Sequence, residues 1–424
     1  MVRIVTKFGG TSLATPERVL SVARRLVAYH NEGNEVVAVV SAMGSATDDL
    51  LTLARSVNAS PPARELDMLL ATGEMVSMSV VAMAIASLGV QAVSLTGRQA
   101  GILTTSTHNK ATISGLRCDR VRQALEDDTI VIVAGFQGIT DNDDITTLGR
   151  GGSDTTAVAL AAGLGADRCE IYSDVDGVYT CDPRVVPRAR KLDEVSYEEM
   201  LELAAAGAGV LQMRAVEFAR NFGVVLLCKS AFSSNPGTTV KEATMESAVV
   251  SGIAYDKSEA KITIRNVPDS LGIAAVVFEA IASSGINVDM IVQNISENGF
   301  TDISFTSPAH ELPRLRPVLD GLLERLGIRE YLVDDTIAKI SVVGAGMKSN
   351  PGIAAKMFKV LAEHNVNIEM ISTSAIRISV VIDGASTSGA LQALHTAFGL
   401  DADDLFEETQ LSAEELAAKA AKGR

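Results

Sequence analysis

Glu35–Ser41 has the sequence EVVAVVS, a run of β-branched and small apolar residues whose core contains no polar position. A strand with one solvent-facing side alternates apolar and polar residues, so this run predicts a strand buried on both faces. Thr129–Ala134 (TIVIVA) and Cys169–Tyr172 repeat the type, and Arg3–Phe8 is a further strand candidate. Strands of this kind lie in parallel sheets that helices cover on both faces. The sequence therefore predicts an α/β domain in its first half.

Helix signals stand between these strands. Thr15-Pro16-Glu17 places a hydroxyl cap, a proline and an acid in the order that opens a helix. Val76–Val90, an apolar run interrupted by serines and a glycine, predicts a buried helix that is too short to span a membrane. In open parallel sheets, ligands bind beyond the carboxyl ends of the strands. Residues that follow the predicted strands are therefore candidates for a site.

Composition limits the class of protein. The 424 residues include 52 acids and 37 bases, for a formal net charge of −15. Surfaces for nucleic acid or anionic membranes need clustered Lys and Arg, so we expect neither partner, although a few local cations can still hold a small anion. The N-terminus enters a strand pattern without a signal-peptide layout. We expect a cytoplasmic protein.

Cysteine and histidine spacing predicts no metal centre and no histidine-based triad. The five histidines form no HxH or HExxH pattern. The cysteines are too widely spaced for a CxxC motif, and we expect them to be reduced and structural: Cys118, Cys169, Cys181 and Cys228.

The second half of the chain contains an internal repeat. Ile286–Ile291 (INVDMI) is answered by Val366–Ile371 (VNIEMI), and Leu271–Ala275 (LGIAA) by Pro351–Ala355 (PGIAA), at the same offset. Each copy predicts a strand, a glycine turn, a helix, an asparagine turn, a strand, a hairpin and a helix. This order indicates a βαββαβ-type module that is present twice.

These patterns divide the chain into four parts. We expect an α/β domain at residues 1–245 and two modules at 246–335 and 336–412. Residues 413–424 are charged and Ala-rich, and we expect a flexible tail there.

Three stretches near the predicted strand ends combine polar residues with glycine. Lys7–Ser12 (KFGGTS) offers a cation and unobstructed amides suited to phosphate, with a plain strand-exit turn as the alternative. Ser41–Gly44 ends the second strand, with Thr47 just beyond. Thr72-Gly73-Glu74 (TGE) puts an acid at a helix start, where a surface acid favoured by the helix dipole is the alternative. No GxxxxGK[ST] motif occurs, so a P-loop is excluded.

Two longer stretches carry denser chemistry. Thr147–Thr156 (TLGRGGSDTT) combines one fixed positive charge, three glycines, an acid and four hydroxyls, which predicts an anion site. Tyr172–Arg184 (YSDVDGVYTCDPR) follows a short strand, and its D-x-D-G spacing is similar to a calcium loop. Apolar residues occupy the remaining ligand positions, so we reject calcium. Gly344-Ala345-Gly346 lacks the third glycine of a dinucleotide turn, and we assign it to a module loop.

Together, KFGGTS, TGE, TLGRGGSDTTA, SDVDGVYTCDPR and the duplicated module closely resemble aspartokinases, in particular the single-function actinobacterial type. The resemblance covers essentially the whole chain. It implies an amino-acid-kinase (carbamate-kinase-like) parallel-sheet sandwich followed by two ferredoxin-like βαββαβ ACT domains. It also implies transfer of the γ-phosphoryl group of ATP to the β-carboxylate of L-aspartate, the first step of lysine, threonine and methionine biosynthesis.

The resemblance also implies roles for single residues. Lys7 would act as an electrophile on the transferring phosphoryl group, and Asp154 would organise the phosphoryl and Mg²⁺ environment. Glu74 would receive the α-ammonium of aspartate, and Arg150 its α-carboxylate. Further contacts to aspartate would come from Ser41, Thr47, Gly151, Gly152 and Ser153. The nucleotide would be held by Lys7, Gly9, Gly10, Ser173, Asp174, Tyr179, Asp182 and Arg184, with Mg²⁺ bound mostly by water and ATP oxygens.

One position departs from the family pattern. A GAKVL-like segment usually supplies a lysine to the nucleotide phosphates, but Gly207–Leu211 has Gly209 at that position. Nearby, Lys229 stands in a segment where a Val-Arg-Ser-like sequence is commoner. A charge-assisted contact contributes about 1.5–3 kcal/mol, so we expect Gly209→Lys to lower the KM for ATP.

The ACT pair implies feedback control by lysine and threonine. Asp289 is the expected partner of a lysine effector's ammonium, so Asp289→Ala is expected to relieve inhibition. For Asn287 and Asn367, simple turn formation is the alternative. Leu271 and Ala375 stand where the family often has Pro and Glu, which leaves the effector's identity open. The effector sites would be lined by Asp269, Gly272, Ala274, Asn287, Asp289, Gln293, Asn367, Ile368, Thr373 and Ser374.

Two alternatives to this function stay open. Another amino-acid or carbamate kinase could share the fold, although the ACT pair and the joint TGE and GRGGSD motifs disfavour it. A catalytically weak regulatory subunit is suggested by Gly209 and opposed by the complete aspartate pocket. We expect a homo-oligomer, or an α2β2 assembly with an ACT subunit that starts internally at Met245.

Overall fold

The computed structural model describes residues 2–243, 249–295 and 298–402. Its first half is built on an eight-stranded sheet with the strand order β10-β12-β11-β9-β1-β2-β6-β3. Neighbouring strands are parallel, except for the antiparallel pair β11 and β12. The strands are β1 (Arg3–Phe8), β2 (Glu35–Val40), β3 (Ala92–Leu95), β6 (Ile130–Ala134), β9 (Arg168–Ser173), β10 (Glu194–Ser196), β11 (Leu226–Ser230) and β12 (Thr238–Lys241).

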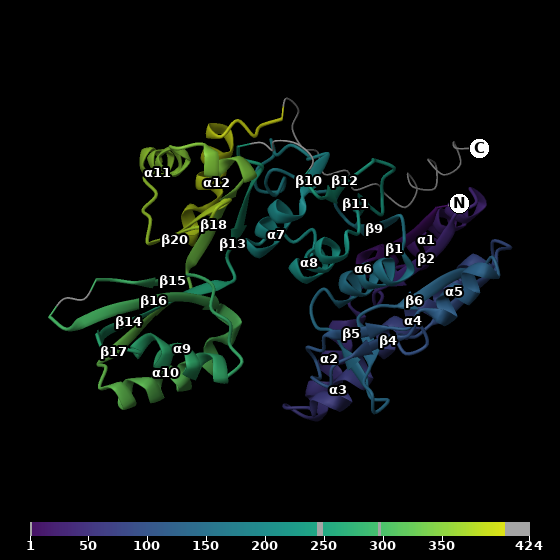
Figure 1. The fold of residues 1–424 in the computed structure, drawn as a ribbon, viewed down its shortest axis with the longest axis horizontal. Coiled ribbons are helices and arrows are strands. Elements are labelled where there is room, and N and C mark those ends of the chain that lie inside the picture. Colours follow the sequence, from purple (N-terminus) through teal and green to yellow (C-terminus); the bar gives the residue numbers. More distant parts are fainter. Residues whose placement is uncertain (1, 244–248, 296–297, 403–424) are drawn as a thin grey trace.

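Helices cover both faces of this sheet, as the side chains of β2 demonstrate (Figure 1). Val36, Ala38 and Val40 pack with residues of α1 and α4. Val37 and Val39 point the other way and join a cluster that includes α5, α6, α7 and α8. The α/β sandwich predicted from EVVAVVS is therefore confirmed. The covering helices are α1 (Pro16–Asn31), α4 (Thr72–Ala86), α5 (Asp119–Glu126), α6 (Gly152–Leu164), α7 (Tyr197–Ala205) and α8 (Met213–Phe222).

A smaller four-stranded sheet and two further helices lie beside the carboxyl edge of the large sheet. The strand order is β5-β4-β7-β8, and the helix pair precedes α4. The bounds are β4 (Ile102–Thr104), β5 (Ile113–Leu116), β7 (Gln137–Ile139), β8 (Ile145–Thr147), α2 (Ala46–Val57) and α3 (Ala63–Leu70).

Helices α3 and α4 together form an unexpectedly long apolar run. In the described residues, Ala63–Ala86 is the one helical run long and apolar enough to cross a membrane, and half of its most apolar window is buried inside the fold. Helix α4 packs against α1 and against strands β2, β3 and β6. The buried helix predicted from the apolar run Val76–Val90 is confirmed as α4, which starts at the Thr72-Gly73-Glu74 stretch and ends at Ala86. Asp67 and Glu74, which interrupt the hydrophobic pattern, are themselves buried in this run.

The second half contains two modules, each with a four-stranded antiparallel sheet and two helices. The sheet orders are β15-β16-β14-β17 and β13-β18-β20-β19. The duplicated module predicted from the repeat is confirmed. The first copy has the full βαββαβ order, whereas the described part of the second copy ends at α12 and its sheet takes β13 as the fourth strand. The first comprises β14 (Glu259–Pro268), α9 (Ile273–Ser283), β15 (Ile291–Gln293), β16 (Phe300–Pro308), α10 (Leu312–Leu326) and β17 (Glu330–Asp334). The second comprises β18 (Ile337–Val343), α11 (Ile353–Glu363), β19 (Met370–Thr373), β20 (Arg377–Asp383) and α12 (Thr387–Ala397).

The strand β13 (Gly252–Asp256) connects the α/β domain to the second module rather than the first. It precedes the first module in sequence, but it pairs antiparallel with β18, from Gly252 opposite Val343 to Asp256 opposite Lys339. The expected division gave this strand to the module at 246–335, whereas its hydrogen bonds assign it to the second sheet. Met245 and the tail at 413–424 lie outside the described residues.

Three ion contacts, made by two equivalent lysines, join the modules. Lys339 of β18 is 2.5 Å from Asp289 and 2.6 Å from Glu259, both in the first module. Lys261 of β14 is 2.5 Å from Glu369 in the second module. Lys261 and Lys339 are each the third residue of equivalent strands. Asp289 and Glu369 occupy equivalent positions in the repeat. Burial alone lowers the pKa of Lys339, but the two carboxylates outweigh burial and raise that pKa, so Lys339 is charged.

Candidate active site

Strands β9, β1, β2 and β6 end side by side at the carboxyl edge of the large sheet. Lys7, near the end of β1, has its ammonium 2.6 Å from Asp154 Oδ1 in the first turn of α6. Both side chains are mostly buried, 14% and 9% exposed. The contact lacks the angles of a hydrogen bond, and Asp154 Oδ1 makes no hydrogen bond in the described residues. A cation and a carboxylate thus meet at this edge with hydrogen-bonding capacity left for a ligand.

The two glycines after Lys7 have different surroundings. A Cβ at Gly10 would lie 2.7 Å from the Ala42 carbonyl oxygen, so only glycine lets the ends of β1 and β2 approach this closely. At Gly9 a Cβ would lie 3.6 Å from Lys7 Nζ, so the glycine leaves the ammonium uncovered. The strand-exit interpretation therefore accounts for Gly10, while Gly9 faces the candidate site.

Glu74 is a buried carboxylate with half of its hydrogen-bonding capacity unused. The residue is 3% exposed, and its Oε1 accepts a hydrogen bond from the Ala42 backbone N–H at 3.0 Å. Its Oε2 is buried and has no partner in the described residues. Burial, opposed only in part by this backbone hydrogen bond, raises the pKa of Glu74 to about 7. A surface acid favoured by the helix dipole is thereby excluded, because the side chain is enclosed.

The stretch TLGRGGSDTT runs from the end of β8 into α6. Gly149 and Gly151 have φ angles of 75° and 69°, a left-handed conformation that favours glycine. Arg150 between them is exposed, and no hydrogen bond or ion pair of its guanidinium is found in the described part of the chain. Ser153 Oγ would be 2.7 Å from a Cβ at Gly135, so Ser153 lies against the end of β6.

Not every predicted contact to aspartate is brought together. The backbone N–H of Ser41 donates to Phe8 O at 3.1 Å, which places Ser41 at the shared edge. Thr47 is half-buried in the first turn of α2. For Thr47 and Arg150, the described residues provide no hydrogen bond or ion pair to Glu74 or Lys7, so their roles stay predictions.

Sequence reasoning missed a buried carboxylate that supports this stretch. Asp67 of α3 is fully buried, and its Oδ1 accepts a 2.5 Å hydrogen bond from Thr147 Oγ1. Its Oδ2 lies 2.8 Å from His108 Nδ1, and both oxygens lie 3.1 Å from the Asn109 N–H. Asp67 therefore anchors the start of TLGRGGSDTT. The spacing of 80 residues between Asp67 and Thr147 hid this link from the sequence.

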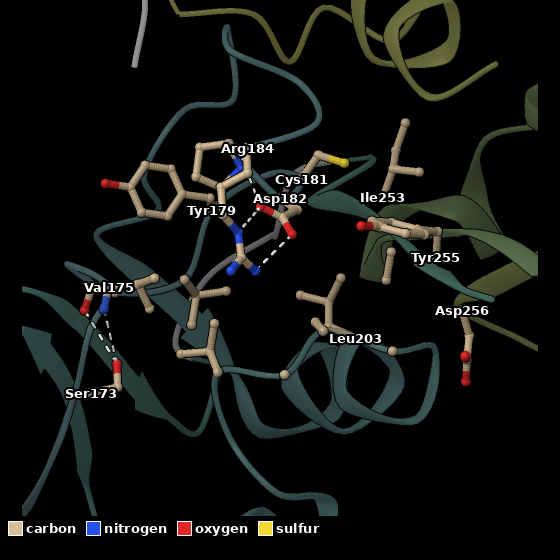
Figure 2. Close-up of a pocket in the computed structure, with 18 of the residues that line it drawn as sticks. Ser173, Val175, Tyr179, Cys181, Asp182, Arg184, Leu203, Ile253, Tyr255 and Asp256 are labelled. Atoms are coloured by element: carbon tan, nitrogen blue, oxygen red, sulfur yellow. Dashed lines mark hydrogen bonds and ion pairs between the residues drawn. The ribbon is translucent and has the colours of Figure 1, made fainter. Parts of the chain in front are cut away.

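A cavity of about 550 Å³ lies beyond the end of β9 (Figure 2). Five residues predicted to hold the nucleotide line it: Ser173, Asp174, Tyr179, Asp182 and Arg184. The Arg184 guanidinium forms a bidentate pair with Asp182, at 3.0 and 2.9 Å. Because Phe8 pairs with Tyr172, Ser173 at the cavity's edge lies next to Gly9 and the Lys7 end of β1. The volume is within the range of cofactor pockets.

The opposite walls of this cavity come from unexpected places. Figure 2 shows Tyr255 and Asp256 of β13 across from Ser173 and Val175, with Leu203 of α7 between them. A Cβ at Gly207 would lie 2.2 Å from the Tyr255 carbonyl oxygen, and Gly207 has φ 112°. Only glycine permits this approach between the α7–α8 loop and β13. The second half of the chain therefore closes part of the cavity through β13.

The residues fit a magnesium ion that arrives with a nucleotide, and they do not form a resident metal site. In the described residues no group of three or more His, Cys, Asp or Glu could hold a metal. Mg²⁺ commonly uses one or two carboxylates plus phosphate oxygens and water. Asp154, whose Oδ1 makes no hydrogen bond, offers one such carboxylate.

Comparisons with known proteins agree with this architecture. Residues 2–230 match the amino acid kinase family, and residues 262–313 and 340–398 match the ACT domain. The aspartokinase of Mycolicibacterium smegmatis is 54% identical over 411 residues, covering 95% of this chain and 98% of that protein. The aspartokinase of Corynebacterium glutamicum is 53% identical with the same coverage.

The chain belongs to the aspartokinase family.

The aspartokinase fold is also found among solved structures. Escherichia coli aspartokinase III, in complex with aspartate and ADP, has a TM-score of 0.79 at 24% identity and covers 93% of this chain and 99% of that chain. Identity at this level shows the fold alone. Membership of the family establishes a phosphotransferase that acts as a kinase, and as a kinase it uses ATP. The predicted resemblance, fold class and enzyme class are therefore confirmed.

Gly209, which stands where aspartokinases usually have a lysine, lies in the cavity wall. Gly209 lines the cavity between α7 and α8, and a Cβ there would meet nothing within 4 Å. The space for a longer side chain is therefore present.

All four cysteines are unpaired and buried, as predicted.

The effector residues expected in the first ACT module surround the start of α9 and the edge strand β15. Gly272 caps α9 in a left-handed conformation, and the Asp269 N–H donates to Gly299 O at 2.9 Å. Ala274 lies in the first turn of α9, and Gln293 ends β15, an exposed strand at the sheet edge. Asp289 is already held by Lys339, so the position expected to bind an effector's ammonium contacts an internal ammonium.

The left-handed turns before Asn287 and Asn367 are made by other residues. The left-handed positions are Gly285 (φ 68°) and Asn365 (φ 56°), each two residues before Asn287 or Asn367. The side chains of Asn287 and Asn367 are therefore not needed for a left-handed turn. Their predicted effector contacts stay untested, as do those of Ile368 and Thr373.

Ser374 contacts the aspartokinase catalytic domain directly. Its hydroxyl donates to Glu202 Oε1 at 3.2 Å, and Arg377 lies 3.1 Å from Glu202 Oε2. Glu202 precedes Leu203, which lines the cavity. Ser374, a predicted effector residue of the second module, therefore contacts the residue that is adjacent in sequence to Leu203 of the cavity wall.

Proposed function

We propose that this aspartokinase binds L-aspartate at the carboxyl edge between Glu74 and Arg150, with its β-carboxylate directed towards Lys7. The observation that supports this arrangement is Glu74 Oε2, a buried carboxylate oxygen without a partner in the described residues. An unpaired buried charge is unfavourable unless a ligand neutralises it. The α-ammonium of an amino acid is such a ligand. Arg150 then supplies a planar guanidinium for the α-carboxylate.

The chemistry needs little from the protein besides positioning and neutralisation of charge. The β-carboxylate is already ionised at neutral pH, so no general base is needed to form 4-phospho-L-aspartate. The Lys7 ammonium stabilises negative charge on the transferring phosphoryl group, while Asp154 holds that ammonium in place. Mg²⁺, when bound with ATP, adds further neutralisation. Gly9 offers an unobstructed backbone, and Ser153 offers a hydroxyl, for contacts to groups that lie between the two substrates.

ATP occupies the cavity beyond β9 in this proposal. Ser173 at its inner edge lies next to Gly9, so the phosphates point towards Lys7, and the base and ribose lie towards Tyr179 and Tyr255. Arg184 brings a cation from the predicted nucleotide segment into this cavity, and Lys257 brings one from its other side.

Gly209→Lys is expected to lower the KM for ATP by about tenfold or more, because a charge-assisted contact to phosphate contributes about 1.5–3 kcal/mol. Gly209 has open space for the new side chain. Gly209→Met adds length without charge, and Gly321→Lys adds the charge to a helix of the first ACT module at another open glycine. Steady-state kinetics with ATP varied should show the gain only in Gly209→Lys. An unchanged or raised KM in that variant rejects the prediction.

Two truncated substrates test the aspartate assignment. Succinate lacks the α-ammonium that Glu74 would bind, and β-alanine lacks the α-carboxylate that Arg150 would bind. Succinate should compete with aspartate much more weakly than analogues that retain the ammonium, because an unmet buried charge at Glu74 costs about 2–5 kcal/mol. β-Alanine should also compete more weakly, because it lacks the carboxylate for a bidentate contact to the exposed Arg150. Inhibition by succinate as strong as the binding of aspartate itself would remove Glu74 from the site.

The ACT modules are proposed to pass amino-acid binding to the kinase through the second module. The contacts that support this route are the Ser374 and Arg377 contacts to Glu202 and the insertion of β13 into the cavity wall. Lysine and threonine are the proposed effectors, in lysine, threonine and methionine biosynthesis. The proposed division of the chain stays at 1–245, 246–335 and 336–412, with β13 contributed to the second sheet.

Asp289→Ala is expected to abolish inhibition by lysine plus threonine while the uninhibited rate stays within about twofold, because surface-module changes rarely reach the chemistry. Lys261→Met serves as the matched control, since it breaks the reciprocal pair with Glu369 without touching Asp289. Inhibition curves should shift in Asp289→Ala alone. If Lys261→Met relieves inhibition equally, loosening of the modules rather than effector contact explains the effect.

We propose a homo-oligomer, or an α2β2 assembly in which a second subunit begins at Met245. Large apolar side chains exposed on the first ACT module support an interface there: Leu271, Ile291, Ile295 and Phe300. Exposed apolar side chains that gather in one patch mark protein–protein contacts, which makes these four residues candidates for a subunit interface.

A further inference from the structure

A buried chain of hydrogen bonds joins the proposed nucleotide segment to the second ACT module. Thr180 lies between Tyr179 and Cys181, which both line the cavity. Its Oγ1 is 2.8 Å from Nε2 of His395 on α12, and His395 Nδ1 is 2.7 Å from Asp401 Oδ1. Thr180 and His395 are both 0% exposed. None of these three residues touches the predicted aspartate site.

The direction of each hydrogen bond follows from the chemistry of the groups. The Asp401 carboxylate only accepts, so His395 Nδ1–H donates to it. Burial lowers the pKa of His395, so the ring is neutral and its Nε2 accepts the Thr180 hydroxyl proton. The Arg190 N–H donates to Thr180 Oγ1 at 2.9 Å. The hydroxyl thus accepts from Arg190 and donates to His395 Nε2, with the Leu400 carbonyl oxygen at 3.5 Å as a longer second acceptor.

The backbone of Thr180 fixes both sides of the cavity. Its N–H donates to Arg190 O at 2.8 Å, and its carbonyl accepts from the Ile253 N–H at 2.7 Å. Ile253 belongs to β13 and lines the cavity from the opposite side. A residue that fixes the position of Thr180 therefore also fixes the nucleotide segment relative to β13 on the opposite side of the cavity.

The surrounding packing makes the nucleotide segment part of the second module. Cys181, Val186 and Ala189 belong to the same buried cluster as the side chains of β18, α11 and α12. The Ala402 N–H donates to Arg188 O at 2.7 Å, which ties the segment after α12 to the same loop. A movement of α12 is therefore expected to move the loop that carries Asp182 and Arg184.

We propose that His395 is a positioning residue for the nucleotide, acting through Thr180 to hold Tyr179–Arg184 and β13 in the arrangement that forms the ATP cavity. The proposal rests on the assignment of that cavity to ATP. The Thr–His–Asp order is similar to a nucleophilic triad, but Thr180 is fully buried and reaches no substrate. Its hydroxyl serves geometry, and the second ACT module thereby supplies part of the nucleotide site.

Two replacements of His395 separate its two hydrogen bonds. The amide of asparagine reaches the position of Nδ1, so His395→Asn keeps the contact to Asp401 and loses Thr180. The amide of glutamine reaches the position of Nε2, so His395→Gln keeps the contact to Thr180. We expect His395→Asn to raise the KM for ATP about tenfold, because the buried Thr180 hydroxyl then keeps only the 3.5 Å contact to Leu400 O as a donor. In His395→Gln the KM for ATP should stay within about twofold, and neither variant should change the KM for aspartate by more than about twofold.

Thr180→Val and Thr180→Ser test the same hydrogen bond from its other partner and keep the proposal testable if a His395 variant does not fold. Valine should reproduce the rise in the KM for ATP, and serine should not. Equal KM values for ATP in His395→Asn, Thr180→Val and the parent enzyme overturn the proposal. So does a parallel rise in both KM values with a lowered Tm, which indicates general destabilisation.

Arg184→Gln distinguishes this proposal from the cavity assignment on which it rests. If Arg184→Gln raises the KM for ATP while the His395 and Thr180 variants do not, the cavity holds ATP and the positioning role is wrong. If Arg184→Gln also leaves the KM for ATP unchanged, the nucleotide binds elsewhere and the proposed function itself must be revised.

Discussion

Replacing Lys7 by methionine is expected to lower kcat about a thousandfold, with a much smaller change in the KM for aspartate. Lys7 is the cation at the end of β1 that faces Gly9, and its ammonium lies 2.6 Å from Asp154 in a site that is mostly shielded from water. A preorganised charge that meets negative charge developing in the transition state typically contributes a factor of about 100–1,000 in kcat. Methionine keeps the length of the side chain and removes the charge.

The loss of Lys7 also leaves Asp154 without its partner, so folding must be controlled. Lys241→Met removes a lysine from the same sheet that has a 2.7 Å ion pair with Glu194, at the opposite edge from the site. This control should keep its kcat. Thermal unfolding of both variants separates a fall in Tm from a fall in rate. A Lys7→Met enzyme that is folded and retains more than about a tenth of kcat would show that Lys7 is not the electrophile.

Glu74→Gln is expected to raise the KM for aspartate about a hundredfold while the KM for ATP hardly changes. Glutamine preserves the shape of the side chain and its contact to the Ala42 N–H, and it removes the negative charge that the α-ammonium would meet. Removing one member of a buried charge pair costs about 2–5 kcal/mol, which corresponds to at least a thirtyfold change in affinity. The matched control is Glu65→Gln, an exposed acid on α3.

The same residue predicts a dependence of aspartate binding on pH. Burial raises the pKa of Glu74 to about 7 in the free enzyme, so the carboxylate is largely charged above pH 7 and protonated below it. Aspartate keeps its ammonium and both carboxylates charged from pH 6 to 8. The KM for aspartate should therefore rise as pH falls below 7, and this rise should disappear in Glu74→Gln. A pH profile that is the same in both enzymes assigns the titration to another group.

Glu74 also links pH to stability, in the opposite direction from an ordinary paired acid. The folded state holds this proton more tightly than the unfolded state, so the native protein binds more protons between about pH 4.5 and 7. Stability of the free enzyme contributed by this group should fall as pH rises through that window. Glu74→Gln should then have the higher Tm at pH 8 despite its weaker binding. Lower stability in exchange for tighter ligand binding is typical of a site that buries a charge for its ligand.

Much of the fold could be predicted because local patterns determined it. EVVAVVS has no polar position in its core, so only a doubly covered strand can accommodate it, and the structure divides Val36 and Val37 between two faces. The repeat predicted both modules, since each copy carries the same turn glycines and apolar spacing. Lys7 and Asp154 were found as separate candidates, and their contact followed once β1 and α6 met at the sheet edge.

The rest depends on contacts between distant parts of the chain, which sequence patterns do not encode. β13 joins the second sheet although the first module follows it directly, and only then does Tyr255 become a cavity wall. His395 was one of several scattered histidines until α12 packed against the nucleotide segment. Asp289 was predicted to bind an ammonium group because of its charge. The repeat did not reveal that the ammonium of Lys339, in the other module, would lie 2.5 Å away.

The central claim is that this one chain transfers a phosphoryl group from ATP to aspartate at the edge formed by Lys7, Glu74 and Asp154. The most direct measurement is a hydroxylamine-trapping assay on the purified chain, in which an acyl phosphate is captured as its hydroxamate. Aspartate with MgATP should give hydroxamate, while glutamate, succinate and reactions without Mg²⁺ should give little. Folded protein that forms no aspartyl hydroxamate at saturating MgATP, or that acts equally well on succinate, would contradict the account.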